Sequence, residues 1–259
     1  MFPAMNKKIR KVLTALIIFL LPSFIVTRVL ILLGHKTSSN CKFGFSLIFV
    51  DKLAMQCGTK IGHFNLLKIR RLVMRPGAYI GRGNLIYGPL DIVLNINAAV
   101  GNSNKISRGP LGSVTFGRSE LRLGQLSKIT ANHRIDCTNS VQIGDFSTLA
   151  GICTQVWTHG YIHEMEGPDR YRIDGRVVIG NNVYIGSGSI ISMGVRLVSG
   201  VIVGAGTTVA RNLDEPGLYV SSAIRQLPRP ISPDSRRDLV KVNSEQLCER
   251  VYEKNLNNK

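Results

Sequence analysis

Residues 179–212 read IGNNVYIGSGSIISMGVRLVSGVIVGAGTTVARN, and an aliphatic side chain recurs there at every sixth position. The six leading residues of these hexads are Ile179, Ile185, Ile191, Leu197, Val203 and Val209. A second apolar set, Val183, Val195 and Val201, follows its leading residues after four positions. A period of six fits neither an α-helix nor the simple alternation of a long strand. The stretch therefore predicts short strands separated by regular turns.

Three such hexads close a triangular coil, with the leading residues pointing inward and glycine or asparagine at the corners. Successive coils then stack at the usual strand spacing of about 4.8 Å. One coil cannot bury its own inner face, so many coils and capped ends are needed. The same spacing recurs upstream, in Leu123, Ile129, Ile135, Ile143 and Leu149, and less regularly in Ile61, Leu67, Val73 and Ile80. We therefore predict a stack of such coils over residues 61–210.

Composition narrows the classes of partner. The chain has 259 residues and a net charge of +17, which suits a polyanion, an anionic membrane face or a phosphorylated ligand. Nucleic acid is disfavoured, because interleaved arginine and aromatic residues are missing and the only tryptophan offers little stacking surface. Five cysteines without a C-x-x-C pair argue against a disulfide framework or zinc knuckle and favour reduced, mostly buried thiols.

Residues 1–36 form a separate segment that is basic, then apolar, then basic. It contains six lysines and arginines and no acidic residue. Pro22 divides the apolar run into two pieces of about ten residues, and Arg28 would lie inside a bilayer, so a single transmembrane helix is disfavoured. We expect two short helices at the cytoplasmic face of the inner membrane; the alternative is a helix pair buried on the protein itself.

The motifs IGNNVYIGSGSIISMGV and VIVGAGTTVARN resemble those of the hexapeptide-repeat acyltransferases, and most closely the sugar O-acetyltransferases related to galactoside and maltose acetyltransferases. The resemblance is specific over residues 141–229 and weaker over 38–140. It implies an all-β, left-handed parallel β-helix, acetyl-CoA as the acyl donor, and a homotrimer with sites between subunits. The left hand comes from the resemblance alone, since crossovers between parallel strands are usually right-handed.

The hexad pattern breaks at residues 157–176, which we expect to form a polar loop. The resemblance places the catalytic histidine at His159, within Thr158-His159. A sugar hydroxyl is scarcely ionised at pH 7, so its attack on a thioester needs a base within hydrogen-bond reach. His163 is the competing candidate, because His-x3-His on a helix, with His133 as a third ligand, could bind zinc. We expect no metal. The acidic partner of His159 is open among Glu164, Glu166 and Asp169.

No G-x-S-x-G, P-loop or dinucleotide motif is present. Cys153 follows Leu149 by four positions, which predicts an inward-facing, inert thiol. Direct attack in a ternary complex is therefore expected.

The resemblance also implies the residues that meet acetyl-CoA. Ser187 and Ala205 would line the pantetheine arm, Ala210 and Arg211 the nucleotide end, and Arg225 a phosphate. The family usually has lysine at the position of Arg211, and a different sequence motif at the position of SSAIRQLPR.

For the acceptor, the stretch ITANHRIDC precedes the catalytic coil by about one turn of the prism. Asn132, His133 and Asp136 are candidates for holding sugar hydroxyls; ordinary corner turns are the alternative.

Residues 231–259 leave the repeat. Pro233 suggests a helix start, and Leu239, Val242, Leu247 and Val251 form an apolar stripe that predicts a packing helix. The expected organisation is thus a membrane-associating segment 1–36, a catalytic β-helix 37–230 and a C-terminal helix and tail 231–259. The expected activity is acetyl transfer to a sugar hydroxyl in surface polysaccharide biosynthesis. The alternatives are N-acetylation of an amino sugar and an inactive scaffold.

Overall fold

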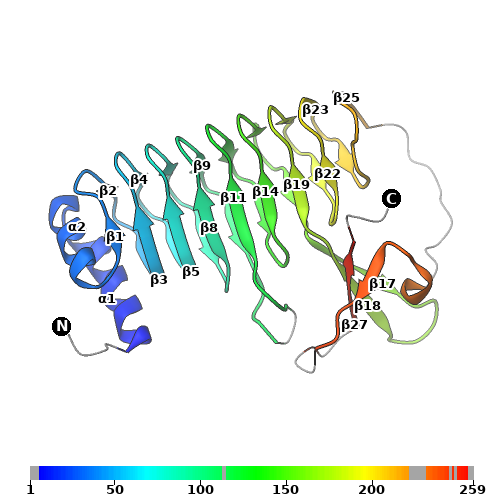
Figure 1. The fold of residues 1–259 in the computed structure, drawn as a ribbon, viewed down its shortest axis with the longest axis horizontal. Coiled ribbons are helices and arrows are strands. Elements are labelled where there is room, and N and C mark those ends of the chain that lie inside the picture. The colour runs from blue at the N-terminus through cyan, green and yellow to red at the C-terminus, as the bar shows by residue number, and fades with distance from the viewer. Residues whose placement is uncertain (1–5, 113–114, 222–231, 245–246, 248–249, 256–259) are drawn as a thin grey trace.

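The computed structural model describes residues 6–112, 115–221, 232–244, 247 and 250–255. Short parallel strands stack into a long three-sided prism, with two helices at one end and a small mixed sheet beside the other (Figure 1). This arrangement confirms the predicted parallel β-helix.

We name the three sides of the prism faces A, B and C. Face A contains the second half of β3 (Leu47–Met55), whose first half lies on face B, and β8 (Asp91–Leu94), β11 (Glu120–Leu123), β14 (Val141–Ile143), β19 (Val177–Ile179) and β22 (Arg196–Leu197), with β1 (Lys36–Thr37) at its start. Face B contains β7 (Leu85–Tyr87), β10 (Lys105–Ser107), β13 (Arg134–Asp136), β16 (Gln155–Val156), β21 (Ile190–Ile191) and β24 (Thr208–Val209). Face C contains β2 (Lys42–Phe43), β4 (Lys60–Ile61), β6 (Tyr79–Ile80), β9 (Ala99–Asn102), β12 (Lys128–Ala131), β15 (Thr148–Leu149), β20 (Tyr184–Ile185), β23 (Val201–Val203) and β25 (Gly217–Tyr219).

Within the described ranges, the large departures from the repeat lie at the edge between faces B and A, which we call the loop edge. The strand β5 (Leu66–Met74) bends across it, pairing first with β7 on face B and then with β8 on face A. Figure 1 shows the connection that precedes β11, the hairpin of β17 (His159–His163) and β18 (Arg170–Asp174), and the start of α1 (Lys7–Leu20) on this side of the prism.

The core is the column of leading residues predicted from the period of six. All six leading residues of the quoted stretch are buried, with exposures between 0% at Ile185 and 3% at Val209. Glycine after a leading residue is explained by the close approach of the next coil. A Cβ on Gly180 would lie 2.6 Å from the backbone nitrogen of Ser199.

Polar side chains form a second buried column at the corner between faces C and B. The side-chain oxygens of Asn65, Asn84 and Asn104 each accept a hydrogen bond from the backbone N–H one coil further, at distances of 2.9 Å. His133 continues the column, since its Nδ1 accepts from the backbone N–H of Thr154. The column supplies hydrogen bonds where the chain turns and strand pairing stops.

The amino-terminal segment forms two helices, α1 (Lys7–Leu20) and α2 (Ser23–Leu32), divided at Pro22 as predicted. Ile18, Val26 and Leu30 are buried and join the core cluster, so the pair closes the first coil of the prism. No helix in the described ranges is long and apolar enough to cross a bilayer.

The predicted C-terminal helix is wrong within the described part of residues 231–259. Pro233 does begin a helix, but it is a single 3-10 turn, η1 (Pro233–Ser235). The chain then forms β26 (Leu239–Lys241) and β27 (Arg250–Lys254), which pair with each other, and β27 pairs with β18 of the hairpin. Tertiary packing overrides the helical spacing, because Leu239 and Tyr252 bury themselves against the hairpin and its open edge gains strand hydrogen bonds.

Candidate active site

The break in the repeat at residues 157–176 is a β-hairpin rather than a loop. Its strands are β17 (His159–His163) and β18 (Arg170–Asp174), and they pair antiparallel from His159 opposite Asp174 to His163 opposite Arg170. The hairpin leaves the loop edge directly after β16 and returns to the prism at β19. His159 therefore stands where the hairpin meets the prism.

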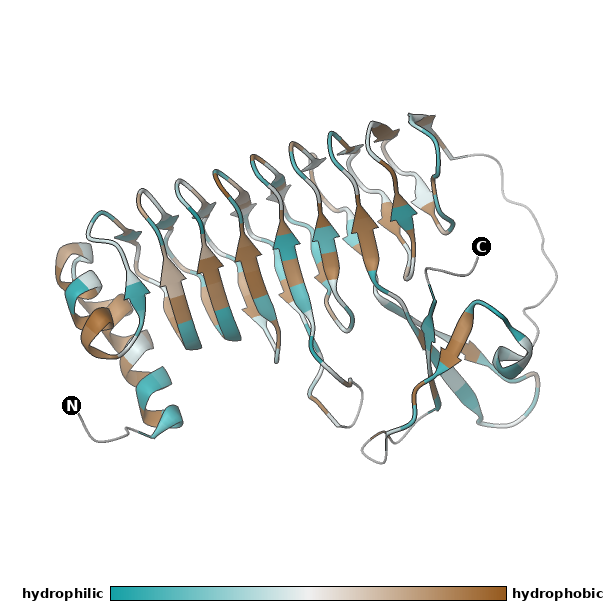
Figure 2. Ribbon diagram, viewed as in Figure 1, coloured by the Kyte–Doolittle hydropathy of each residue, from teal (hydrophilic) through white to brown (hydrophobic). Residues whose placement is uncertain are grey.

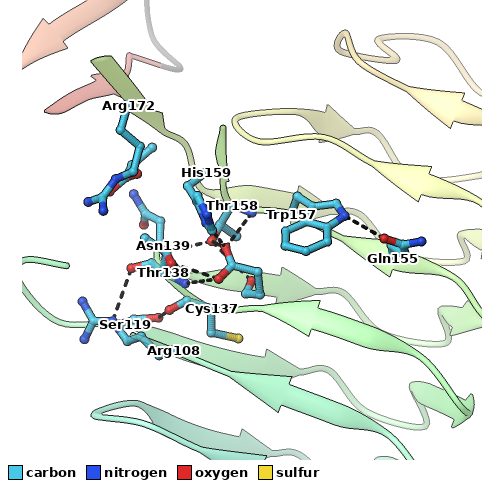
Figure 3. A network of polar contacts seen from close by, with 12 residues as sticks. Arg108, Ser119, Cys137, Thr138, Asn139, Gln155, Trp157, Thr158, His159 and Arg172 are labelled. Atoms are coloured by element: carbon cyan, nitrogen blue, oxygen red, sulfur yellow. Dashed lines mark hydrogen bonds and ion pairs between the residues drawn. The ribbon is translucent and has the colours of Figure 1, made fainter. Parts of the chain in front are cut away.

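His159 is paired with an acidic residue on the coil beneath it. Its Nδ1 lies 2.9 Å from Oδ2 of Asp136, the last residue of β13 (Figure 3). The side chains of His159 and Asp136 are 26% and 10% exposed. Strand register makes this pairing possible, because Ile135 and Val156 are neighbours on adjacent coils. The residues that follow each of them consequently meet at the loop edge.

The carboxylate of Asp136 is held in place by four further donors. Its Oδ2 accepts from the backbone N–H and the hydroxyl of Thr158. Its Oδ1 accepts from the backbone N–H and the hydroxyl of Thr138, at 3.2 and 2.9 Å. The Thr158 hydroxyl oxygen also accepts from the backbone N–H of Asn139 at 2.9 Å. The position of the carboxylate is thus fixed before any substrate arrives.

These contacts shift the pKa values of both partners toward the ion pair. Burial alone would raise the pKa of Asp136, but hydrogen bonds from His159, Thr158 and Thr138 and the charge of His159 hold it below its usual range. The hydrogen bond to Asp136 raises the pKa of His159 above the ordinary histidine value, although burial opposes it. Asp136 is therefore ionised at neutral pH.

An ionised carboxylate can only accept hydrogen bonds. Nδ1 of His159 therefore carries a proton and donates it in the hydrogen bond to Asp136. In the neutral imidazole this leaves Nε2 with its lone pair free to accept a proton. The arrangement is that of an oriented general base, with the carboxylate stabilising the imidazolium formed when a proton is taken.

Two partly exposed aromatic rings flank His159, and sequence reasoning missed both. The rings of Trp157 and Tyr161 lie edge-on to the imidazole, with centroids 6.1 and 6.0 Å away. Trp157 is fixed by a hydrogen bond from its Nε1 to Gln155, and the Arg170 guanidinium lies over the Tyr161 ring. The alternation 157, 159, 161 places the three rings on one side of the strand.

A buried ion pair supports the hairpin beside His159. Arg172 donates two hydrogen bonds to Asp174 at 2.8 and 3.1 Å, and their side chains are 2% and 1% exposed. Burial raises the pKa of Asp174 to about 6, against the opposing effect of Arg172. Asp174 faces His159 across the hairpin, and its charge adds to the raised pKa of that histidine.

The wall below the site is held by Arg108, also missed in the sequence. It is 3% exposed, and its guanidinium donates to the backbone oxygens of Pro89, Phe116, Gly117 and Thr138. Arg108 thereby ties three successive turns of the loop edge together.

The acidic residues considered as partners of His159 lie elsewhere. Glu164, Glu166 and Asp169 are exposed towards the tip of the hairpin, and Glu164 pairs with Arg250. His163 lies four residues along the same strand, so its Cα is about 13 Å from that of His159 at the normal rise per residue. The helical His-x3-His face is therefore not formed. The described residues hold no cluster of three or more potential metal ligands.

The three residues predicted to hold the acceptor separate in the structure. Only Asp136 reaches the site, where it pairs with His159. Asn132 is an exposed corner residue with a left-handed φ of 54°. His133 is 1% exposed within the polar column, so it cannot touch a sugar. Its prediction as an acceptor residue is wrong, because the corner column needs a buried hydrogen-bonding side chain there.

The predicted acetyl-CoA residues fall on both sides of face B. Ser187 and Ala205 lie on the turns before β21 and β24, whereas Ala210 and Arg211 follow β24 at the loop edge. Ala205, Ala210 and Arg211 are exposed. Arg225 lies outside the described residues.

The expected burial of Cys153 is wrong. Cys153 is exposed, on a corner with a φ of 63°. A turn between β15 and β16 puts it at the corner rather than on a strand, so the spacing of four from Leu149 does not make it an inward position. The buried thiol near the site is Cys137, whose pKa burial raises.

No protein-family model matches the chain, and no curated protein sequence matches it. Several solved structures do. The polySia-specific acetyltransferase NeuO is 19% identical, with 70% of this chain and 92% of that chain covered and a TM-score of 0.37. The polysialic acid O-acetyltransferase OatWY is 16% identical, with 78% and 95% covered and a TM-score of 0.32.

AntD, an N-acyltransferase from Bacillus cereus solved with dTDP and coenzyme A, is 18% identical, with 74% of this chain and 82% of that chain covered and a TM-score of 0.34. By their names all three are acyltransferases, the class that the repeat motifs resemble.

Proposed function

We propose that the chain is an acetyltransferase that moves acetyl from acetyl-CoA to a hydroxyl of a polysaccharide or of a lipid-linked glycan precursor. The observation that carries the proposal is the Asp136–His159 pair at the loop edge. An inactive scaffold would have no need of a carboxylate held by five hydrogen bonds behind an imidazole.

In the proposed reaction, Nε2 of His159 takes the proton of the sugar hydroxyl as that oxygen attacks the thioester carbonyl. The C–O bond forms, and the carbonyl electrons move to oxygen to give a tetrahedral oxyanion, which a backbone N–H would stabilise. The carbonyl then re-forms, the C–S bond breaks, and the leaving CoA sulfur takes the proton from the imidazolium. Asp136 holds Nδ1 and stabilises the positive charge throughout.

The donor would lie along face B, on the coils after the one that carries His159. Ser187 and Ala205 would line the pantetheine arm, and Ala210 and Arg211 would meet the nucleotide end. Trp157 and Tyr161 would offer apolar ring faces to the acceptor sugar. We propose a homotrimer, because a flat prism face becomes a cleft only when another subunit covers it.

The helices α1 and α2 would dock the enzyme on the cytoplasmic face of the inner membrane. Several apolar residues of both helices are exposed, and Figure 2 shows that the two helices are largely hydrophobic apart from the hydrophilic start of α1. The exposed residues of this surface include Leu16, Phe19, Leu20, Phe24, Ile31 and Leu32. Acid-free basic flanks would suit anionic lipid.

The experiment is acetyl transfer from labelled acetyl-CoA by the purified protein, with neutral, amino and acidic sugars as acceptors. We expect transfer by the wild type and a loss of about 10²–10⁴-fold in His159→Ala. His163→Ala is the matched control, on the same strand. Release of label by mild alkali identifies an ester, and resistance would establish the alternative N-acetylation. No transfer to any acceptor in a panel that includes lipid-linked glycans would contradict the proposal.

A further inference from the structure

A large cavity lies at the other end of the loop edge, beside the start of α1. Its volume is about 780 Å³. It is bounded by the start of α1, the turn before β1, and the middle of β3 and β5 where the chain crosses from face B to face A. Its charged lining consists of Lys7, Arg10, Lys36, Asp51, Lys52, Arg70, Asp91, Arg71 and Arg118.

Positive charge exceeds negative charge in this cavity by seven residues to two. Both carboxylates are already engaged. Asp91 accepts two hydrogen bonds from Arg70, each 2.7 Å long, and Asp51 pairs with Lys11 at 3.0 Å. The six other cations have no ion pair among the described residues; they are Lys7, Arg10, Lys36, Lys52, Arg71 and Arg118. These like charges repel one another, and a bound anion would reduce that repulsion.

The exposed cations Lys7, Lys36, Lys52, Arg71 and Arg118 surround a wall that more buried contacts hold in place. Arg10 donates to the backbone oxygen of Asp51 at 2.7 Å, and its buried Nε has no acceptor among the described residues. His35 is buried between the Thr14 hydroxyl and the backbone N–H of Leu53. Burial and Arg10 lower the pKa of His35 to about 4, so the neutral imidazole bridges α1 to β3 at physiological pH.

The position of the cavity relates it to His159. Four strand steps separate β5 from β16 along face B, through β7, β10 and β13. At about 4.8 Å per step the basic lining lies about 19 Å from the start of the hairpin, on the same edge of the prism. The acetyl-CoA positions proposed above lie beyond His159 in the opposite direction, and the connection between β10 and β11 lies between the cavity and His159.

We propose that this cavity binds a phosphate or diphosphate group carried by the acceptor, about 19 Å from the hydroxyl that is acetylated. The assignment to the acceptor rests on the proposed function, whereas binding of the anion does not. Guanidinium groups favour phosphate because their fork matches its oxygens, and a volume well above that of one ion suits a diphosphate. An acceptor that spans both sites must have several sugar units between its phosphate and its reactive hydroxyl.

The test compares charge reversal inside the cavity with the same reversal elsewhere. Arg71→Glu/Arg118→Glu changes two exposed cations of the lining, and Arg82→Glu/Lys128→Glu changes two exposed cations on the side of face C. Calorimetric titration of the full chain with inorganic pyrophosphate should give binding that weakens about tenfold or more in the first variant only. Equal weakening in both variants would overturn the proposal as a net-charge effect, as would no binding to the wild type.

Activity assays and vesicle-binding measurements identify the source of the phosphate. With a water-soluble alkyl-diphosphate oligosaccharide as acceptor, the cavity variant should show a KM about tenfold or more above wild type. With a neutral monosaccharide it should match wild type. If phosphatidylglycerol vesicles bind the wild type but pyrophosphate does not, the cavity is a membrane contact and the proposal fails. Pyrophosphate binding that depends on Arg71 without any acetyl transfer would keep the anion site and refute only the proposed function.

Discussion

Replacing Asp136 by asparagine removes the charge behind His159 while keeping the shape of the side chain. Five donors converge on this carboxylate, and an amide has only one oxygen to offer them. If the oxygen stays towards His159 and Thr158, the two donors of Thr138 face an NH₂ group. Hydrogen bonds to a charged group contribute about 1.5–3 kcal/mol each. We therefore expect the free energy of unfolding to fall by about 3 kcal/mol or more.

The loss of kcat in Asp136→Asn should not exceed the loss caused by removing the base, His159. Loss of His159 should cost about 10²–10⁴-fold in kcat, or about 2.7–5.4 kcal/mol. Asp136→Asn should cost less than this at pH 7, because the imidazole remains. The double variant Asp136→Asn/His159→Ala should be no slower than His159→Ala alone, since Asp136 acts only through that histidine.

The pH profile isolates the electrostatic part. A general base must be unprotonated, so wild-type kcat/KM should rise with pH through the pKa of His159, which lies above its ordinary value of 6.5. The largest cause of that raised pKa is the hydrogen bond to Asp136, so Asp136→Asn should move the rising limb to lower pH. Rates of CoA release measured with a thiol reagent across the range test this.

Asp214→Asn is the matched control, because it removes a carboxylate from a surface pair with Arg196. This variant should leave both kcat and the rising part of the pH profile of kcat/KM unchanged. An unmoved limb in Asp136→Asn, together with losses that multiply in the double variant, would refute the assignment of Asp136 as the orienting partner.

Three further predictions concern the scaffold, and urea unfolding measures each. Ile191→Ala should lower the free energy of unfolding by about 2–5 kcal/mol, because it opens a cavity in the column of leading residues; a loss below about 1 kcal/mol would contradict that packing. Asp174→Ala should cost about 3–5 kcal/mol by leaving Arg172 charged and buried, and Arg172→Met/Asp174→Leu should recover most of it. Gly180→Ala should cost about 1–3 kcal/mol, since its Cβ would meet the Ser199 backbone at 2.6 Å, and an unchanged midpoint would show that the coils can separate.

The prism was predictable because its stability depends on a local rule repeated many times. Each leading residue must fill the same inward position, so the period of six appears directly in the sequence. The same reasoning failed where a position is set by a distant partner. Leu239 and Val251 have helical spacing, yet both lie in strands, because the open edge of the hairpin offers hydrogen bonds that an isolated helix would forgo.

The candidate site was half predictable for a related reason. His159 was predicted because the family resemblance places the catalytic histidine there, at the point where the repeat breaks. Asp136 was correctly placed one coil earlier, but as an acceptor contact rather than as the partner of His159. The useful signal is the register: once Ile135 and Val156 are recognised as leading residues of adjacent coils, Asp136 lies under Thr158 and His159. Trp157 offered the same signal, being the first residue after Val156.

The loop edge gathers the unusual residues because it is where the repeat can be interrupted at least cost. An insertion at a corner leaves the inward positions on either side unchanged, so the core continues through it. Arg108 and Asp136 then use the corner's own backbone groups to fix what protrudes. The basic cavity and His159 are both consequences of this geometry, four strand steps apart on one straight edge. Because the distance between these two sites is fixed, the enzyme would select acceptors by the number of sugar units between the phosphate and the reactive hydroxyl.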